Sequence, residues 1–278
     1  MDPATQQATE AAARAGVEVR TLHSGTELVA AAELLTELWR SQFSEHVLRA
    51  FELSGNYVAG AFDSDGVLVG ASVAWASVAP APELHSHVTG VAPGLRRSGM
   101  GVALKLHQRA WALANGIGTI TWTFDPLVLR NAVFNLARLG ASAEGYLENV
   151  YGVMEDGMNL GESDRLWIRW HLTEPDVERA AAGTPCRVRP PAGAAERLWP
   201  GPGGEPLEPV ELGRADSGGG FLCRVHPDIE LLRREDPVLA DSWRAATRRV
   251  MGGALAAGGR VLGLDEAGGY VILGTPEA

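Results

Sequence analysis

A short basic turn with two glycines is the clearest place where this chain can bind an anion. Residues 91–104 read VAPGLRRSGMGVAL, so a polar strand runs through the turn directly into an amphipathic helix. Gly99 and Gly101 have no Cβ where an anion must approach the backbone, and the first N–H groups of a helix have no intrahelical partner. These donors, the positive end of the helix dipole and the side chains of Arg96 and Arg97 suit a pyrophosphate. The predicted contacts are Val91, Arg96, Arg97, Ser98, Gly99, Met100, Gly101 and Val102.

A tight packing turn is the alternative that Gly-x-Gly alone would favour. The whole string, with Arg-x-x-Gly-x-Gly after Val-x-Pro, is much more specific for the anion site.

Polar side chains alternate along the strand before this turn and along the next predicted strand. A parallel strand buried on both faces is almost continuously apolar, yet His85, His87 and Thr89 are spaced to share one face of residues 83–91. Thr119, Thr121, Thr123 and Asp125 repeat the pattern. Two such faces on neighbouring strands predict a wet cleft. His87 is the first choice for a proton acceptor, because an imidazole titrates near neutrality, followed by His85 and then Glu83. The alternative is that the histidines only shape the cleft through hydrogen bonds.

Hydrophobic periodicity and turn signals indicate the elements that position these residues. A strand, a helix and another strand over 83–91, 99–115 and 118–124 imply a right-handed crossover with parallel pairing. The other expected strands are 17–22, 57–62, 67–73, 142–153, 164–171, 261–264 and 270–273, and the other expected helices are 28–39, 45–53, 129–139 and 237–257.

Composition places the chain among globular proteins and limits the kinds of partner that it can bind. It has 278 residues, 24 basic and 34 acidic, with a net charge of −10, which argues against a protein built to coat nucleic acid. Cys186 and Cys223 lie far apart without metal-ligand spacing, and no segment is apolar enough to span a bilayer. We therefore expect a cytoplasmic protein without a metal. Residues 1–16 are predicted as a flexible tail or loose helix, 17–173 as one domain, and 174–278 as an extension that starts with a Pro/Gly-rich linker.

The order of elements, together with the turn at 91–104, resembles the GNAT superfamily of acyl-CoA-dependent N-acyltransferases. Further blocks are similar to a branch that includes N-succinyltransferases of amino acids. They read TWTFDPL at 121–127, NAVFNLARLGA at 131–141, YLENVYG at 146–152 and DPVLADSWRAATR at 236–248. The resemblance covers nearly the whole chain.

The resemblance implies a mixed, mostly antiparallel sheet with a central, splayed parallel strand pair and flanking helices, plus a small α+β extension. It implies acetyl-CoA or another acyl-CoA as donor, a small amine as acceptor, direct attack on the thioester, and a monomer or homodimer. Many members place a tyrosine, which protonates the departing thiolate, four residues before the glycine of the second block. Here that residue is Leu136, so the resemblance does not supply the acid, and Tyr146, Tyr151 or water are the candidates to replace it.

The same resemblance favours Asn131 and Asn135 as contacts of the donor, and the later strands as the acceptor side. The expected acceptor contacts are Trp122, Asp125, Asn149 and Arg165. Arg165 suits a carboxylate of an amino acid or of a succinyl group, and each of these residues has a surface or packing role as its alternative. Trp243, Arg244 and Arg248 are expected to be packing and salt-bridge residues of the extension.

Three other functions stay open at this point. One is transfer from an aminoacyl-tRNA or a carrier-protein thioester, of which the acidic balance disfavours the tRNA version. Another is a CoA-binding module without turnover, which the missing tyrosine keeps possible. A dinucleotide-binding enzyme is the weakest, because Leu104 stands where its third glycine belongs.

Overall fold

A computed structural model describes residues 2–77, 81–95, 98–154, 161–209 and 219–274. The described chain forms two compact units, one of residues 2–122 and 171–174 and one of residues 123–154, 161–170 and 175–274. Each unit contains its own strands and its own helices, and each is described by itself.

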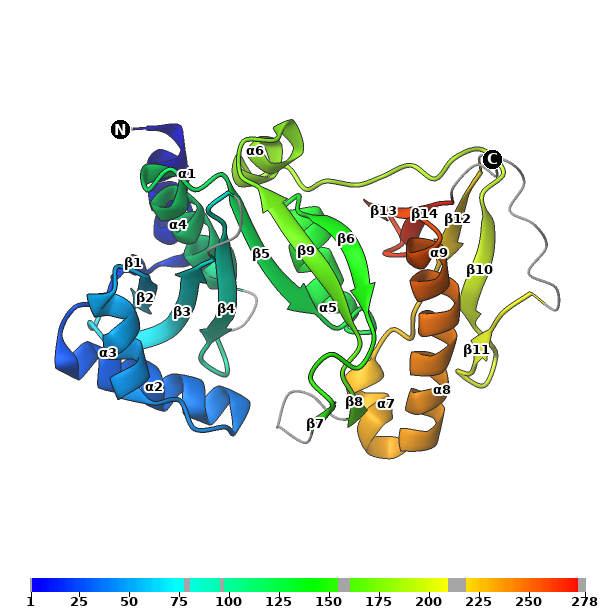
Figure 1. Cartoon of the computed structure of the whole chain (residues 1–278), viewed down its shortest axis with the longest axis horizontal. Coiled ribbons are helices and arrows are strands. Elements are labelled where there is room, and N and C mark those ends of the chain that lie inside the picture. Colours follow the sequence, from blue (N-terminus) through cyan, green and yellow to red (C-terminus); the bar gives the residue numbers. More distant parts are fainter. Residues whose placement is uncertain (1, 78–80, 96–97, 155–160, 210–218, 275–278) are drawn as a thin grey trace. The chain divides into compact units, whose positions relative to one another are not determined.

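The first unit is a sheet in the order β1-β2-β3-β4-β5, with helices on both faces (Figure 1). All neighbours pair antiparallel except β4 and β5, which pair parallel as predicted. The elements are α1 (Pro3–Ala15), β1 (Glu18–Thr21), α2 (Gly25–Trp39), α3 (Glu45–Leu53), β2 (Tyr57–Phe62), β3 (Leu68–Ala76), β4 (Leu84–Val91), α4 (Met100–Ala114) and β5 (Thr119–Phe124), whose last two residues belong to the second unit.

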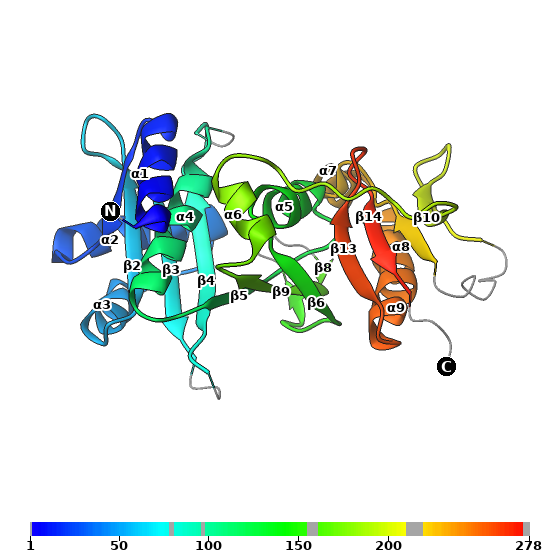
Figure 2. The same cartoon turned by 90° about the horizontal axis from the view of Figure 1, so that it is seen from above.

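Two apolar clusters cover the two faces of this sheet. Leu28, Leu35 and Leu48 of α2 and α3 pack with residues such as Val73 on one face. On the other face Met100 and Leu104 of α4 pack on Ala61 and Val69. Figure 2 shows α1 and α4 lying together over this second face.

The N-terminal stretch, predicted as a flexible tail or a loose helix, contains helix α1. The Asp2 side chain accepts from the Thr5 N–H at 3.0 Å, and Gly16 ends α1 in the left-handed region at φ 68°. Buried alanines at positions 4, 8, 11 and 12 form one face of the helix. An all-alanine face carries a weak periodic signal, which is why the sequence pattern left both a tail and a loose helix open.

A β-bulge in β4 changes which face its polar residues occupy. Val73 pairs with Val88, and the next β3 residue, Ala74, pairs with Ser86, so His87 is the extra residue. Ser86 and Thr89 therefore both point toward α4, whereas His85 and His87 lie beside Trp75. The expectation that Thr89 shares a face with the two histidines is wrong, because strict alternation cannot anticipate a bulge.

The second unit contains a sheet in the order β9-β6-β13-β14-β12-β10-β11 and a separate pair, β7-β8. Its pairs are antiparallel except β10 with β12. The elements are α5 (Leu129–Ala132), the π-helix η1 (Val133–Arg138), β6 (Ser142–Leu147), β7 (Val153–Met154), β8 (Gly161–Glu162), β9 (Arg165–His171), α6 (Pro175–Ala181), β10 (Ala195–Pro200), β11 (Pro206–Leu207), β12 (Gly220–Cys223), α7 (Ile229–Glu235), α8 (Pro237–Thr247), the π-helix η2 (Arg248–Gly252), α9 (Gly253–Ala256), β13 (Arg260–Leu264) and β14 (Tyr270–Leu273).

These pairings confirm the predicted fold class, a mixed, mostly antiparallel sheet structure with a parallel strand pair and flanking helices. Three elements are less regular than expected. The helices over 129–139 and 237–257 each contain a π-helical segment. The strand expected over 142–153 stops at Leu147, and Asn149 turns the chain at φ 42°.

Candidate active site

The start of α4 carries the predicted anion site. Gly94 and Gly99 have φ of 87° and 89°, a left-handed conformation that a residue with a Cβ adopts only with strain. Gly99 is the N-cap of α4, and no side chain caps the helix among the described residues; the Met100 N–H makes only a long, 3.4 Å bond to the Ser98 hydroxyl. The first turn of α4 therefore offers backbone donors and contains no acidic residue.

The remaining predicted contacts of this turn divide into two groups. Val91, Gly101 and Val102 are half-buried and place the backbone of the turn against the unit. Arg96 and Arg97 lie outside the described residues.

His85 and His87 are brought together on the face of β4 opposite α4. Their rings lie 5.2 and 4.8 Å from the Trp75 ring, and the His85 Nδ1 is 3.3 Å from the Thr121 hydroxyl of β5. Phe43 lies 6.3 Å from His87. Burial lowers the pKa of both imidazoles, and the neighbouring charges of His87 and Lys105 lower that of His85 further. Both rings are thus neutral at pH 7 and able to accept a proton. Glu83, just before β4, is half-buried.

A buried polar network occupies the other face of β4, and the sequence pattern did not single it out. Lys105 of α4 donates to the Ser86 hydroxyl at 2.8 Å and to the Gln108 Oε1 at 3.0 Å. Gln108 in turn donates to Ser72, which bonds Thr89 at 2.8 Å. Trp122, predicted to contact the acceptor, is buried, and its ring lies under the Lys105 ammonium. The available signal was a lone lysine at a core-facing helix position.

Tyr146 and Tyr151 of the second unit have different surroundings. The Tyr146 hydroxyl donates to the Asp164 Oδ2 at 2.7 Å, and burial together with this carboxylate raises its pKa well above the usual range. Such a phenol is a poor proton donor to a thiolate. Tyr151 is 55% exposed, and its hydroxyl lies 3.1 Å from the Thr123 hydroxyl. Tyr151 is therefore the better candidate acid.

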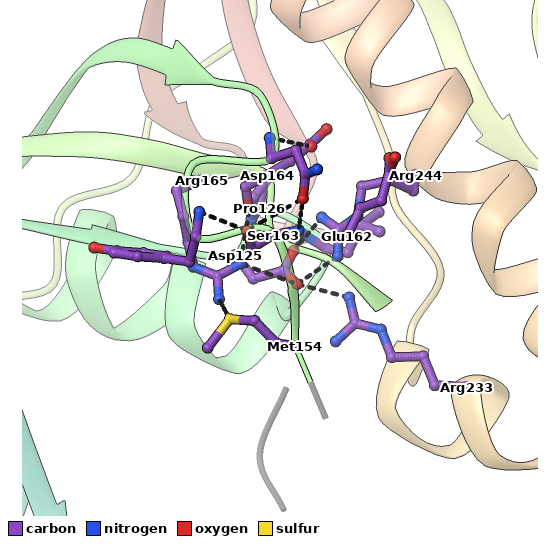
Figure 3. Close-up of polar contacts among 12 residues, drawn as sticks. Asp125, Pro126, Met154, Glu162, Ser163, Asp164, Arg165, Arg233 and Arg244 are labelled. Atoms are coloured by element: carbon purple, nitrogen blue, oxygen red, sulfur yellow. Dashed lines mark hydrogen bonds and ion pairs between the residues drawn. The ribbon is translucent and has the colours of Figure 1, made fainter. Parts of the chain in front are cut away.

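Asp125, expected to contact the acceptor, is the centre of a buried ion cluster (Figure 3). Its carboxylate accepts from Arg233 at 2.6 Å and from both terminal nitrogens of Arg244 at 2.7 and 2.8 Å. Burial raises the pKa of Asp125, but the bonds and charges of Arg244 and Arg233 outweigh it and lower that pKa to about 2. Its oxygens also accept from the Leu127 N–H. These contacts give Asp125 a structural role.

Arg165 lies at the edge of this cluster, as Figure 3 shows. Its guanidinium donates to the Asp164 carbonyl at 3.0 Å, contacts the Met154 sulfur, and lies 3.9 Å from Asp125 and 5.6 Å from the Tyr151 ring. Burial lowers the pKa of Arg165, and this effect outweighs the negative charge of Asp125, which raises that pKa. A guanidinium in this setting, close to the half-exposed Tyr151, suits a carboxylate.

The asparagines expected to bind substrates are mainly tied to the protein. The Asn149 Oδ1 accepts from the Ser163 N–H at 3.1 Å, and its own N–H donates to Asp164 at 3.0 Å. Asn135 is buried within η1, whereas Asn131 is half-buried in α5. Leu136, at the position of the missing tyrosine, is also buried in η1.

The arginines of the extension form salt bridges, as predicted. Arg244 pairs with Asp125, while Arg248 pairs with Asp164 at 2.6 Å and with Glu162 at 2.5 Å. These contacts hold α8 and η2 to the ends of β5 and β9 within the second unit. Roles in catalysis or binding for the remaining predicted residues stay predictions.

The described part of the chain contains neither a membrane-spanning helix nor a cluster of metal ligands. No helix there has the length and apolar character needed to cross a bilayer. No three His, Cys, Asp or Glu side chains gather there in a way that would hold a metal ion.

The chain was compared with known proteins. No protein-family model and no curated protein matches it. Its structure is similar to the ribosomal-protein-S18-alanine N-acetyltransferase from Escherichia coli, with 16% identity, a TM-score of 0.46, and coverage of 57% of this chain and 95% of that one. It is also similar to yncA from Salmonella typhimurium, solved with its cofactor acetyl-CoA, with 17% identity, a TM-score of 0.47, and coverage of 57% and 95%.

An acetyltransferase of the GNAT family from Streptococcus pneumoniae gives 14% identity, a TM-score of 0.44, and coverage of 55% of this chain and 98% of that one. These similarities involve a little more than half of this chain.

Proposed function

We propose that the chain is a GNAT-type N-acyltransferase that moves an acyl group from coenzyme A to the amine of a small molecule. The observation that carries the proposal is the start of α4. Gly99, the first glycine of the Val-x-Pro-x-x-Arg-x-x-Gly-x-Gly string, has φ 89° and is the N-cap of α4, whose first turn has no side-chain cap among the described residues. Backbone donors of this kind suit the pyrophosphate of coenzyme A.

The chemistry requires a base, an oxyanion donor and an acid. The acceptor nitrogen attacks the thioester carbonyl, a C–N bond forms, and the C–S bond breaks. We assign His87 as acceptor of the ammonium proton, because burial keeps its imidazole neutral at pH 7. The bulge leaves one β4 residue without a partner opposite it in the register, so backbone N–H groups there are the candidate oxyanion donors. Tyr151 is assigned to protonate the thiolate.

The acceptor is proposed to be an amine that also bears a carboxylate, such as an amino acid. Arg165 supports this assignment, because its guanidinium lies 5.6 Å from the ring of the exposed Tyr151, and a guanidinium can bind a carboxylate through two parallel hydrogen bonds. Replacing Arg165 by Met is expected to raise KM at least tenfold for amino acids, with little change for amines that lack a carboxylate. Equal losses for both classes would contradict the assignment.

The direct test incubates the protein with a panel of acyl-CoAs and amines, and follows free thiol release and product mass. Turnover with at least one pair is expected. Tight CoA binding without turnover across the panel would indicate a binding module, and turnover only with carrier-bound or tRNA-bound acyl groups would indicate another donor. Replacing Arg96 and Arg97 by Ala should weaken CoA binding, since each removes a charge available to phosphate.

A further inference from the structure

Aromatic side chains gather around His87 on the face of the first sheet that α2 and α3 cover. The centre of the Trp75 ring of β3 lies 4.8 Å from that of the His87 ring, and the centre of the Phe43 ring, between α2 and α3, lies 6.3 Å from it. Trp39 lies 6.1 Å from Phe43, and Phe51 of α3 lies 5.4 Å from Trp75. The four side chains, here called the aromatic cluster, thus form a chain of ring contacts with the imidazole in its middle.

The backbone around the aromatic cluster holds its rings in place. The Phe43 N–H donates to the Thr36 hydroxyl of α2 at 3.0 Å, which turns the chain after the helix back toward it. Gly90 of β4 has no side chain, and an atom of the Trp39 ring lies 2.6 Å from the place where its Cβ would be. The cluster is therefore a fixed part of the fold, and a ligand can bind to it without first ordering the rings.

Every ring of the aromatic cluster keeps part of its surface in contact with solvent. Trp39, Phe43, Phe51 and Trp75 are half-buried, and His87 is exposed. Large apolar side chains that share one site and stay partly exposed are typical of ligand-binding surfaces, because their contact with water is unfavourable. The assigned base thus stands among apolar surfaces that a bound ligand can cover.

Aromatic rings can bind either an apolar group or a cation, and the two histidines distinguish these ligands. Burial lowers the pKa of His85 and of His87, so the surroundings of both imidazoles disfavour a positive charge. A cationic substituent would meet the same penalty, whereas an apolar one gains free energy by covering the rings. The site therefore suits an apolar group.

We propose that the aromatic cluster selects the acceptor, and that the acceptor carries an aromatic or large apolar group next to its amine. An amine whose proton passes to His87 lies within hydrogen-bond distance of the imidazole, which places its substituents beside Trp75 and Phe43. Among amino acids, phenylalanine and leucine fit this description, and glycine, alanine and lysine do not. The inference rests on the proposed function, because it takes His87 as the base.

Pairs of acceptors that differ only in their apolar group test the proposal. The pairs are phenylalanine with alanine and 2-phenylethylamine with ethylamine, and lysine supplies a cationic side chain. With the acyl-CoA that gives turnover, we expect kcat/KM to be at least about tenfold higher for the aromatic member of each pair, and higher for phenylalanine than for lysine. Equal values within both pairs, or a preference for lysine, would overturn the proposal.

Phe43→Ala removes one ring of the aromatic cluster and leaves His87 in place. We expect it to lower kcat/KM about tenfold for the aromatic acceptor and less than about twofold for the small one. The ratio of the two values does not depend on how much of the variant is folded. Phe43→Leu restores most of the apolar surface and should restore most of the ratio. If Phe43 only positioned His87, both acceptors would lose the same factor and the ratio would stay constant, which would overturn the proposal.

Leu53→Ala is the matched control, because it removes a large apolar side chain of the same unit that is 75% exposed and lies outside the aromatic cluster. The ratio should equal that of the parent protein, and an equal fall of the ratio in Leu53→Ala and Phe43→Ala would overturn the proposal. Calorimetry should give the same CoA affinity for Phe43→Ala and the parent protein. A loss of CoA affinity with an unchanged ratio would assign the rings to the donor instead.

The same assays separate this inference from the proposed function. If the parent protein turns over no pair of acyl-CoA and amine, the proposed function fails, and the inference fails with it. Turnover without a preference for the aromatic acceptors would overturn the inference alone.

Discussion

Replacing Asp125 by Asn tests whether the ion cluster of the second unit is structural. Arg233 and Arg244 are 8% and 6% exposed, and their shared partner Asp125 is 4% exposed. The substitution keeps the size of the side chain but leaves both guanidinium groups facing an uncharged amide. Removing one partner of a buried ion pair costs about 3–5 kcal/mol, so we expect a loss of this size at pH 7.

The pKa of Asp125 gives a second, independent magnitude. An ordinary value of 3.8 lowered to about 2 corresponds to roughly 2.4 kcal/mol at 1.36 kcal/mol for each pKa unit. Because the folded state lowers this pKa, the contribution is present above about pH 4 and disappears as the pH falls toward 2. The Asn variant cannot titrate and should lack this part of the acid dependence.

Hydrogen exchange measures the loss where it occurs. Opening free energies of α8 amides should fall by about 3–5 kcal/mol in Asp125→Asn, whereas amides of α4, in the first unit, should change little. Asp176→Asn is the matched control, because the Asp176–Arg179 pair is 61% and 60% exposed and should cost below about 1 kcal/mol. If both variants lower the opening energy of α8 by the same small amount, the cluster does not stabilise the unit.

Three further predictions concern catalysis and the donor. His87→Gln should lower kcat by about 10²–10⁴ and remove the acid limb of the pH–rate profile. In the parent protein this limb should lie below pH 6.5, because burial lowers the pKa of His87. An unchanged profile would exclude His87 as the base. Tyr151→Phe should slow single-turnover thiol release while Tyr146→Phe should not, and the opposite ranking would reverse our assignment of the acid. Gly99→Ala should weaken CoA binding about fivefold and reduce stability by about 1 kcal/mol, since φ is 89° there, and unaltered affinity in calorimetry would contradict the anion site.

Periodic and local signals located most elements. The bounds of α3, β2 and β14 are those predicted from the sequence, because apolar periodicity and turn residues mark both ends. In the β2–β3 hairpin, for example, the Asp63 carboxylate accepts from the Val67 N–H at 2.9 Å, and Gly66 takes φ 76°. Such signals act over a few residues, so a single sequence is enough to detect them.

The bulge at His87 and the partners of Asp125 could not be predicted in this way. A bulge leaves the composition of a strand unchanged and reverses every face beyond it, which moved Thr89 away from His85 and His87. Asp125 is joined to Arg244 across 119 positions of the sequence. The spacing of residues within a strand predicts which face a side chain occupies, but it carries no information about such distant partners.

Exposure and partners, taken together, distinguish candidate catalytic groups from structural ones in this protein. Asp125, Asp164 and Asn149 are polar residues of the second unit, and each is occupied by hydrogen bonds from within that unit. His87 and Tyr151 both keep solvent-exposed surface, although partial burial lowers the pKa of His87. The described side-chain contacts of His87 are with the Trp75 and Phe43 rings, and those of Tyr151 are with the Thr123 hydroxyl and the Arg165 guanidinium. A group that must exchange a proton with a substrate has to keep a position open for it, whereas a group that joins helices to strands has to be saturated. The arginines of the extension saturate Asp125 and Asp164, and this supports assigning the acid and base chemistry to His87 and Tyr151.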